Sequence, residues 1–529
     1  MRSIPINSHR ESAPGQLRGS SGQSRPTGVI LSAAAVVIVV LTASLSNPQT
    51  LAGVLMTAGL ALVVMLRTRP LAALAVVVFL AIASRPTFEI ASVNIRVEQP
   101  AVIFLAVHAL IRERPLVRAL FRQYAVPIAG LVVWLVAAAV SSALFAPDLV
   151  ASLRIVIWLA LSMVAGGVAG VLAAREGDAG RVAHALVVVG IVHVGISLTA
   201  ALTGRVLGVE WGGYGWTGVS YGFRASGLAW EANIFASAMA TLIPFGVAGL
   251  VRSGSLREVG LVALLSLAVW VALTRTVFVS LALGLGLMVV LFAIRDRDYA
   301  RIWAQRLGVA AIALIVGLGA GGLVTAASST VSRGLLATRT EIGIEGRLPA
   351  LPTSTPGPIA TPSLSPTPGP TPSTGPTPTP PPPIPIDMGD PGNLEARLVR
   401  VRQALQDIQQ SPILGLGANS FGQRHADPSQ AFRADYLGML PFTVLYDSGI
   451  VGLAGFALFG LGSLLHLWRW RVPFFASAFL AALAIMFASY VMTDALRLAF
   501  SWIVIGTALG LAHRAQASAG AGDSQGRSD

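Results

Sequence analysis

The sequence contains no cysteine and no lysine, and it carries few charged residues of either sign. Of its 529 residues only 12% are charged, whereas 54% are hydrophobic; soluble domains carry about 25% charged residues. The absence of cysteine excludes disulfides, thiolate metal sites and a cysteine nucleophile. Together with a mean hydropathy of +0.72, the shortage of charge predicts an integral membrane protein.

All 37 basic residues are therefore arginine, and the formal net charge is +13. The arginines cluster in short segments between apolar runs, such as 67–70, 112–124 and 469–471. Membrane proteins keep short basic loops of this kind on the cytoplasmic side. The excess of positive charge thus indicates membrane topology, and it gives no reason to expect a nucleic-acid partner.

Apolar runs long enough to cross a bilayer recur along the chain, since a helical span needs roughly 17–25 residues. We expect an all-α membrane protein with about 14 transmembrane helices. The candidate spans centre on 28–46, 50–66, 70–85, 98–112, 125–145, 154–174, 182–203, 231–251, 258–274, 276–294, 307–326, 437–467, 473–492 and 496–512. With the N-terminus inside, the arginine-rich loops fall inside, and 86–97, 204–230 and 327–436 fall outside.

This topology divides the chain into five predicted segments. The polar, basic N-terminus is expected to be a disordered cytoplasmic tail, because a signal peptide has a shorter basic region and a cleavage site. The segments are the tail 1–27, transmembrane helices 1–11 in 28–326, a large extracytoplasmic loop 327–436, transmembrane helices 12–14 in 437–513, and a second disordered cytoplasmic tail 514–529.

The large loop contains a spacer and a helix. Residues 349–386 are rich in Pro, Thr and Ser and predict an extended spacer with no core; we interpret it as a dispensable insertion in preference to a glycosylated or binding segment. A basic amphipathic helix is predicted over 393–410. Arg397 and Arg400, three residues apart, lie next to each other on its surface. Its apolar stripe is expected to face the membrane domain and consists of Leu394, Leu398, Val401, Leu405 and Ile408.

Two further sets of residues open predicted spans from the outer side. Arg275 lies in A-L-T-R-T, between the spans 258–274 and 276–294; it either extends to the membrane interface or acts on a substrate. Glu231 and Asn233 follow Trp230 after a loop rich in Gly, Trp and Tyr that also contains Arg224. The aromatic residues fit an interface belt or a surface on which sugar rings stack, and Glu231 and Asn233 fit either a helix cap or a substrate site.

Histidine is the remaining candidate for acid–base chemistry. His425 lies in G-Q-R-H-A-D of the outer loop, within chain reach of the membrane, and is either a solvated side chain or a general base. His, Asp and Glu show no metal-ligand spacing, and no glycine-rich nucleotide-binding loop is present. We therefore expect no metal and no cofactor.

These motifs occur in the order found in a known family. G-L-A-W-E-A-N-I-F-A-S, L-T-R-T-V-F-V-S and R-L-V-R-V-R-Q-A-L-Q-D-I-Q-Q-S-P-I-L-G-L-G-A-N-S-F are followed by D-S-G-I-V-G-L. The chain thus resembles, over about 225–460, the O-antigen ligase and O-antigen polymerase superfamily. That superfamily carries an N-P-N-like element, an S-R-G-like helix start, R-x-x-x-W-x-x-A-L…P-x-x-G-x-G-x-x-x-F and H-N…E-x-G-x-x-G-L. Asn233, Arg275, Arg397, Gly415 and Gly417 occupy matching positions.

The resemblance implies a GT-C-like membrane fold and a metal-independent, inverting oligosaccharide transfer. The implied donor is a glycan on undecaprenyl diphosphate, and the acceptor is a sugar hydroxyl on lipid A core or on a growing polysaccharide. The reaction would take place on the outer, periplasmic face of the cytoplasmic (inner) membrane. Arg275 and Arg397 would stabilise the diphosphate leaving group. The residues that would contact substrate are Arg400, Glu231, Asn233, Trp230 and Arg224.

Two positions depart from the pattern. The family tryptophan falls on Val401, and the family histidine, the proposed base of the ligases, falls on Gly438. His425 is then the candidate for the base, with Glu231, Asp435 and Asp447 behind it. Two other functions stay open: a lipid-linked oligosaccharide transporter or flippase, in which internal repeats are common, and a non-catalytic relative that scaffolds envelope polysaccharide assembly.

Overall fold

The computed structural model describes residues 69–84, 87–90, 93–96, 98–207, 226–229, 231–341, 394–425, 437–491 and 497–525. All of them belong to one compact unit, which begins at Leu62. The predicted spans 28–46 and 50–66, the tail 1–27, the last residues 526–529 and the spacer 349–386 lie outside the described residues. Residues 514–525 of the predicted C-terminal tail are described, and they continue the last helix.

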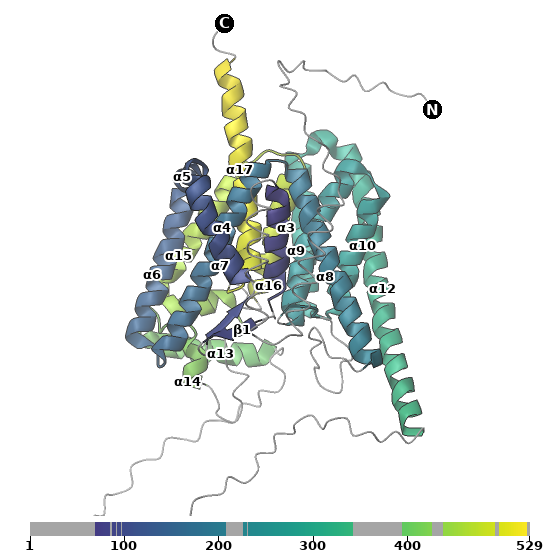
Figure 1. The fold of residues 1–529 in the computed structure, drawn as a ribbon, viewed down its shortest axis with the longest axis horizontal. Helices are drawn as coiled ribbons and strands as arrows, with labels where there is room; N and C mark the ends of the chain where they lie inside the picture. Colours follow the sequence, from purple (N-terminus) through teal and green to yellow (C-terminus); the bar gives the residue numbers. More distant parts are fainter. Residues whose placement is uncertain are drawn as a thin grey trace, which may run out of the picture. The chain divides into compact units, whose positions relative to one another are not determined.

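Helices make up nearly all of the described chain (Figure 1). In sequence order they are α3 (Pro70–Ile82), α4 (Glu98–Arg112), α5 (Arg114–Gln123), α6 (Ala125–Phe145), α7 (Leu149–Glu176), α8 (Ala179–Leu207), α9 (Ala232–Ser253), α10 (Leu256–Val271), α11 (Arg275–Arg295), α12 (Ala300–Glu341), α13 (Leu394–Asp407), α14 (Ser420–His425), α15 (Leu440–Arg469), α16 (Phe475–Val491) and α17 (Ala499–Gln525). Short 3₁₀ turns precede α12 (η1, Arg297–Tyr299) and follow α13 (η2, Ile408–Gln410).

Seven of the described helical segments are long and apolar enough to cross a membrane. They are Ala125–Phe145, Leu149–Glu176, Ala179–Ala200, Ala232–Ser253, Arg275–Arg295, Arg297–Ala326 and Leu440–Arg469. Together with the shorter apolar helices α3 and α16, they fit the expected helical membrane protein. The total of about 14 spans and the GT-C-like arrangement stay predictions.

One small β-hairpin interrupts the helices, which the all-α expectation did not include. Strands β1 (Thr87–Ile90) and β2 (Val93–Arg96) pair antiparallel, with Thr87 opposite Arg96 and Ile90 opposite Val93. The strand residues alternate polar and apolar types over only four positions each, and a run this short is a weak sequence signal. The hairpin places Arg96 at the start of α4.

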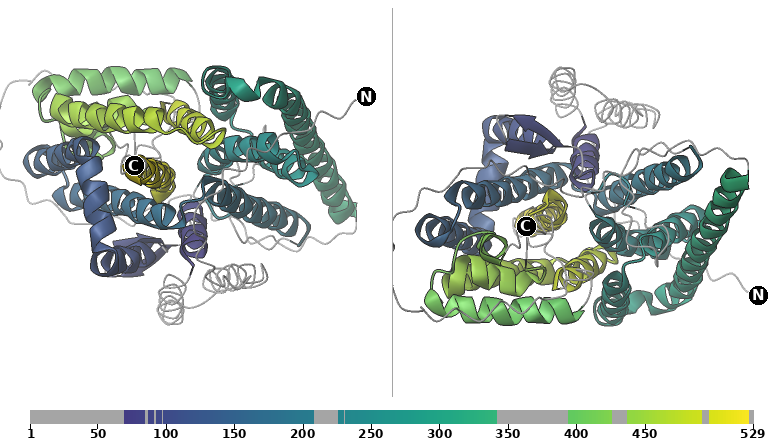
Figure 2. Two further views of the ribbon diagram at one scale, coloured as in Figure 1. Left: turned by 90° about the horizontal axis from the view of Figure 1, so that it is seen from above. Right: turned by 90° about the horizontal axis from the view of Figure 1, so that it is seen from below.

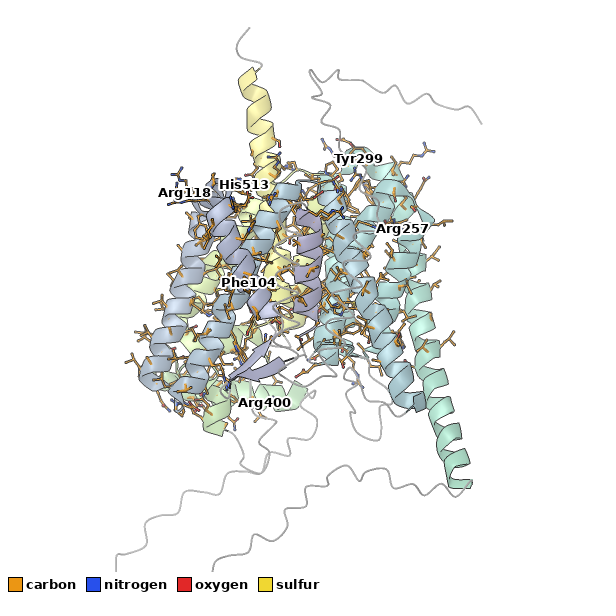
Figure 3. The ribbon with its side chains drawn as sticks, in the orientation of Figure 1. Phe104, Arg118, Arg257, Tyr299, Arg400 and His513 are labelled. Carbon is orange, nitrogen blue, oxygen red and sulfur yellow. The ribbon has the colours of Figure 1, made fainter. Side chains whose placement is uncertain are left out.

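The two ends of the helical bundle differ in their connections. Arg257 and Tyr299 lie at one end, whereas Arg400 on α13 lies at the other (Figure 3). We refer to the latter as the α13 end. The β-hairpin, α13 and α14 lie there (Figure 1). The arginine-rich connections lie at the opposite end and comprise 112–124, 175–181, 252–258, 295–306 and 469–471.

Pairs of glycines bring the central helices into close contact. Gly166 and Gly170 on α7 face Gly506 and Gly510 on α17, and a Cβ built at any of these four positions would lie 3.0 Å or less from the backbone of the other helix. Both pairs have the G-x-x-x-G spacing that lets membrane helices approach backbone to backbone. α17 is consequently surrounded by other helices when the bundle is viewed along its axis (Figure 2).

Candidate functional site

Helix α15 is broken near its N-terminal end. Gly449 has φ 63° and ψ −165°, a conformation outside the helical region, and positive φ of this kind is readily adopted only by glycine. The break removes intrahelical partners from the carbonyl groups before it and the N–H groups after it. Backbone groups inside a membrane protein require other partners when the helix does not supply them.

The segment 412–417 supplies these partners. The N–H groups of Leu416 and Gly417 donate to the carbonyls of Tyr446 (2.8 Å) and Asp447 (3.2 Å). In return, the N–H groups of Ile450 and Val451 donate to Pro412 (3.0 Å) and Ile413 (3.2 Å). The P-x-x-G-x-G and D-S-G-x-x-G motifs are therefore two halves of one hydrogen-bonded structure.

Asp447 and Arg497 form an ion pair beside this break. Arg497 Nη2 lies 3.6 Å from Asp447 Oδ2, and its Nη1 donates to Asn419 Oδ1 at 3.0 Å. Asp447 Oδ1 in turn accepts from the backbone N–H of Asn419 at 3.1 Å. The three side chains thus connect the glycine turn, α15 and the segment before α17.

The surroundings of the pair indicate a structural role for it. Its cavity has a volume of only about 30 Å³ and is lined by Trp134, Val156 and Thr443 among others. A space of that size holds about one water molecule, so no sugar or diphosphate fits there. Ser142 from α6 closes the same region by accepting from the N–H of Ala418 at 2.9 Å.

Arg96 of the hairpin supports the segment that carries Arg497. Its Nη1 donates to the carbonyl of Arg497 at 2.9 Å, and its guanidinium lies 4.7 Å from the centre of the Trp158 ring. Burial lowers the pKa of Arg96, whereas the carboxylate of Glu98 opposes this shift. Arginine nevertheless stays charged in proteins, so the hairpin contributes a fixed positive charge at the α13 end.

A second polar cluster joins α13, α14 and α15. The Tyr446 hydroxyl donates to Asp407 Oδ2 at 2.9 Å, and His425 Nε2 lies 2.6 Å from the same oxygen. Phe421 packs against both rings, with centroids 4.7 Å from His425 and 5.4 Å from Tyr446. With Asp407 as acceptor, Nε2 of His425 carries the proton and Nδ1 is left as the basic nitrogen.

Helix α13 rests on a small core, by a face that matches the expected one only in part. Ala404 belongs to a buried cluster with Leu416, Phe421, Leu437 and Tyr446. Leu398 and Leu405 of the predicted apolar stripe are 45% and 42% exposed. Val401 and Ile408 of that stripe are buried as expected, and Arg400 and Ala404 are buried with them. Ala404 packs in this cluster against Tyr446 of α15.

The predicted arginines have different positions. Arg397 lies on α13, and its side chain lies outside the described part of the structure, whereas Arg400 is 6% exposed. Arg275 is the first residue of α11 and is exposed. Since α11 ends near Tyr299, Arg275 lies at the α13 end (Figure 3). Within the described residues, no hydrogen bond or ion pair connects Arg275 with His425.

The residues before α9 are partly described. Glu231 takes the N-cap position of α9 without a side-chain cap hydrogen bond. The Asn233 side-chain oxygen accepts from the N–H of Ile234 at 3.0 Å. The structure therefore does not bear out side-chain capping by Glu231, and it leaves the substrate-binding prediction for Glu231 and Asn233 untested. Trp230 and Arg224 lie outside the described residues.

Sequence reasoning missed Arg497, Arg96 and the partnership of Asp407 with His425. An arginine within the apolar run L-R-L-A-F is itself a signal, because ionisable residues at membrane depth carry a function or a buried partner. The departure at Gly438 has a structural counterpart, since its φ is +76°. A histidine at this position would be strained, because side chains other than glycine rarely adopt such angles.

Helical segments of membrane-spanning length define a multi-pass membrane protein. Its candidate site lies at one end of the bundle, where α13 packs near the break in α15. The comparison with protein families gives one match. Residues 260–457 match the family Wzy_C, described as O-Antigen ligase, and this match supports the resemblance to the O-antigen ligase and polymerase superfamily. No curated protein matches the chain. The matched residues include Arg275, α13, the glycine turn and the break in α15.

Proposed function

We propose that the protein transfers a glycan from undecaprenyl diphosphate to a sugar hydroxyl, and that the reaction occurs at the α13 end of the bundle on the outer face of the cytoplasmic membrane. The family match supports an O-antigen ligase-like membrane enzyme in general. The observation that carries the finer proposal is the interlocked pair of motifs at Gly415 and Gly449, because it fixes α13 and α14 over the membrane domain.

In this reaction the acceptor hydroxyl attacks the anomeric carbon while the bond to the diphosphate oxygen breaks on the opposite side. A single displacement of this kind inverts the configuration at that carbon. The leaving diphosphate gains negative charge, which Arg275 and Arg397 stabilise; guanidinium groups pair bidentately with phosphate oxygens. Donors placed where charge develops lower the barrier by electrostatic stabilisation.

His425 accepts the proton of the acceptor hydroxyl. Its contact with Asp407 resembles the arrangement in which a carboxylate orients an imidazole and stabilises the imidazolium that forms. The side chain of His425 is 30% exposed, so a substrate at the surface can reach Nδ1. Imidazole is the side chain that most often acts as a general base in enzymes.

A second function is favoured by one observation. The family position of the catalytic histidine is Gly438 with φ +76°, which is compatible with a non-catalytic relative that scaffolds polysaccharide assembly. The structure offers no comparable observation in favour of a transporter.

The deciding experiment uses the native donor. Deletion of the gene should reduce surface polysaccharide and cause lipid-linked precursor to accumulate. That precursor, extracted from the deletion strain, should be consumed by the purified full chain in proteoliposomes, with release of undecaprenyl diphosphate. Growth of the glycan on the lipid indicates a polymerase, and its appearance on lipid A core indicates a ligase. Binding of donor without release contradicts the enzyme and favours the scaffold; movement of intact donor across the vesicle membrane favours the transporter.

A further inference from the structure

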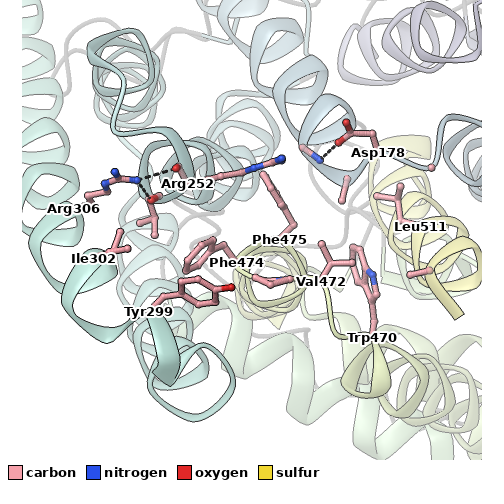
Figure 4. Close-up of a pocket in the computed structure, with 16 residues that line it drawn as sticks. Asp178, Arg252, Tyr299, Ile302, Arg306, Trp470, Val472, Phe474, Phe475 and Leu511 are labelled. Atoms are coloured by element: carbon pink, nitrogen blue, oxygen red, sulfur yellow. Dashed lines mark hydrogen bonds between the residues drawn. The ribbon is translucent and has the colours of Figure 1, made fainter. Parts of the chain in front are cut away.

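A cavity of about 630 Å³ lies at the end of the bundle opposite to α13. Its walls come from the α7–α8 connection, the C-terminal end of α9, the start of α12, the connection 470–475 and α17 (Figure 4). Five candidate membrane spans begin or end around it. Lipid head groups lie at this level of a bilayer, and the size falls within the usual range of small-molecule sites, about 300–1,000 Å³.

One wall of the cavity is aromatic. Phe474, Phe475 and Tyr299 line it, and Trp470 lines the cavity apart from them, beyond Val472 (Figure 4). Trp470 is only 1% exposed, and its Nε1–H has no hydrogen-bond partner among the described residues. A buried N–H without an acceptor is unfavourable, because it has lost its hydrogen bond to water. The cavity therefore combines an aromatic surface with one N–H donor that has no acceptor among the described residues.

The rim of the cavity carries a guanidinium with free donors. Arg252 is exposed, and within the described chain its side chain makes no hydrogen bond; its contact is with the face of the Phe475 ring, at 5.5 Å. The adjacent Gly180 leaves this space open, because a Cβ there would collide with the Arg252 guanidinium.

The other charged groups of the rim are already engaged. Arg306 donates to the carbonyls of Val251 and Arg252 at the end of α9. Asp178 Oδ1 accepts from the N–H groups of Gly180 (2.8 Å) and Arg181 (3.1 Å). Arg306 thus adds positive charge without offering its bound nitrogen, and the carboxylate is partly neutralised by the start of α8.

We propose that this cavity binds the phosphate head group of an anionic phospholipid from the surrounding bilayer. Arg252 donates to a phosphate oxygen, the Trp470 N–H donates to a further oxygen of the head group, and the aromatic wall covers the glycerol and the start of the acyl chains. Basic pockets between membrane helices recognise anionic head groups in this way. The N-terminal segment of the chain is unsuited as the occupant, because Arg2, Arg10, Arg18 and Arg25 make it basic.

Native mass spectrometry of the full chain in detergent tests this proposal. Phosphatidylglycerol, phosphatidylethanolamine and inorganic phosphate are titrated separately into wild type, Arg252→Gln, Arg252→Lys, Trp470→Phe and the control Arg118→Gln. Arg118 is an exposed arginine at the same end of the bundle (Figure 3), so its substitution removes the same charge away from the cavity. Each variant is compared only after it elutes as folded protein in size-exclusion chromatography.

Phosphatidylglycerol should bind wild type and Arg118→Gln alike, and more tightly than phosphatidylethanolamine does. Arg252→Gln should weaken phosphatidylglycerol binding by about tenfold or more, since a hydrogen bond to a charged group contributes roughly 1.5–3 kcal/mol. Arg252→Lys and Trp470→Phe should weaken it less. Equal affinity for both lipids, or an unchanged affinity in Arg252→Gln and Trp470→Phe, overturns the proposal. Complete displacement of the lipid by millimolar phosphate would assign a free-anion site instead.

Discussion

Gly415 and Gly449 approach each other so closely that neither position has room for a side chain. A Cβ on Gly415 would lie 2.5 Å from the backbone nitrogen of Gly449, and the two residues have φ of +80° and +63°. The contact joins the loop motif to the broken helix, so the whole α13–α14 segment depends on it.

Replacement of either glycine by alanine should therefore destabilise the protein. An L-residue at positive φ costs roughly 1–2 kcal/mol, and the collision with the backbone adds to this cost. We expect Gly415→Ala and Gly449→Ala to lower the thermal unfolding temperature in detergent and to abolish transfer. Gly460→Ala, also on α15, is the control, because a Cβ there meets nothing within 4 Å. If Gly415→Ala or Gly449→Ala melts at the same temperature as Gly460→Ala, the close contact between the two glycines does not stabilise the protein.

Removal of Arg275 or Arg397 should abolish transfer without loss of folded protein. Loss of a donor beside developing negative charge costs about 2–4 kcal/mol of transition-state stabilisation, which is roughly 10²–10³ in rate. Arg→Lys should restore only part of the activity, because an ammonium cannot make the bidentate contact. Arg118→Ala, at the opposite end, should be fully active. Full activity of Arg275→Ala or Arg397→Ala would exclude that arginine from the reaction.

The residues that define the site were partly visible in the sequence, because the glycine motifs are local patterns with fixed spacing. Pro412, Gly415 and Gly417 could be placed before α15 on that basis. The sequence could not reveal that Asp447 bonds to Asn419 and Arg497, or that Arg96 contacts Arg497, since these partners are 28 to 401 positions apart. Such pairings follow from helix packing, which no local pattern encodes.

The buried face of α13 was predicted only in part, for a similar reason: Val401 and Ile408 are buried as expected, but two leucines of the same stripe are not. Leu398 and Leu405 have the hydrophobicity expected of a buried face, yet both are exposed, whereas Ala404 is buried at 3% exposure. Periodicity assigns a face by hydrophobicity alone. Ala404 packs against Tyr446 and Leu416, where a small side chain fits. This packing outweighs the free energy that burial of the two leucines would have contributed.

The ion pair between Asp447 and Arg497 should contribute to stability through coupling. The side chains are only 13% and 18% exposed, so loss of one partner leaves the other poorly solvated. Asp447→Asn and Arg497→Gln should each lower the melting temperature, and the double variant should lose less than the sum, with a coupling of about 0.5–3 kcal/mol. The more exposed pair Arg175–Glu113, 3.2 Å apart, serves as control and should show about 0–1 kcal/mol. If the losses of stability in Asp447→Asn and Arg497→Gln simply add in the double variant, the two side chains are not coupled and the prediction is wrong.

The topology can be tested with single cysteines, because the natural chain contains none. We expect both termini and the arginine-rich connections inside, with 327–436 outside. A membrane-impermeant maleimide added to spheroplasts should label Pro370→Cys, and it should label Ala300→Cys and Gln525→Cys only after lysis. Labelling of Pro370→Cys only after lysis would invert the topology and would place the proposed reaction on the cytoplasmic side.

His425 should be the base of the transfer, and the pH dependence of the rate can separate this role from a structural one. The wild-type rate should fall on the acid side, because a protonated imidazole cannot accept the proton of the acceptor hydroxyl. His425→Ala should lose about 10²–10⁴ in rate together with the acid limb, and added imidazole should restore part of the rate. Asp407→Asn should lower the rate while the protein stays folded.

A matched histidine provides the control. His184 lies at the opposite end of the bundle, and its Nδ1 is 3.2 Å from Glu258, with the side chain 32% exposed. His184→Ala removes a histidine–carboxylate pair of similar exposure and should leave both the rate and its pH profile unchanged. If His425→Ala keeps the wild-type rate and acid limb, the proton acceptor is a carboxylate, with Glu231 as the next candidate. If His425→Ala is slow and added imidazole does not restore its transfer rate, the role of His425 is structural. It then only holds α14 against α13 through its contact with Asp407.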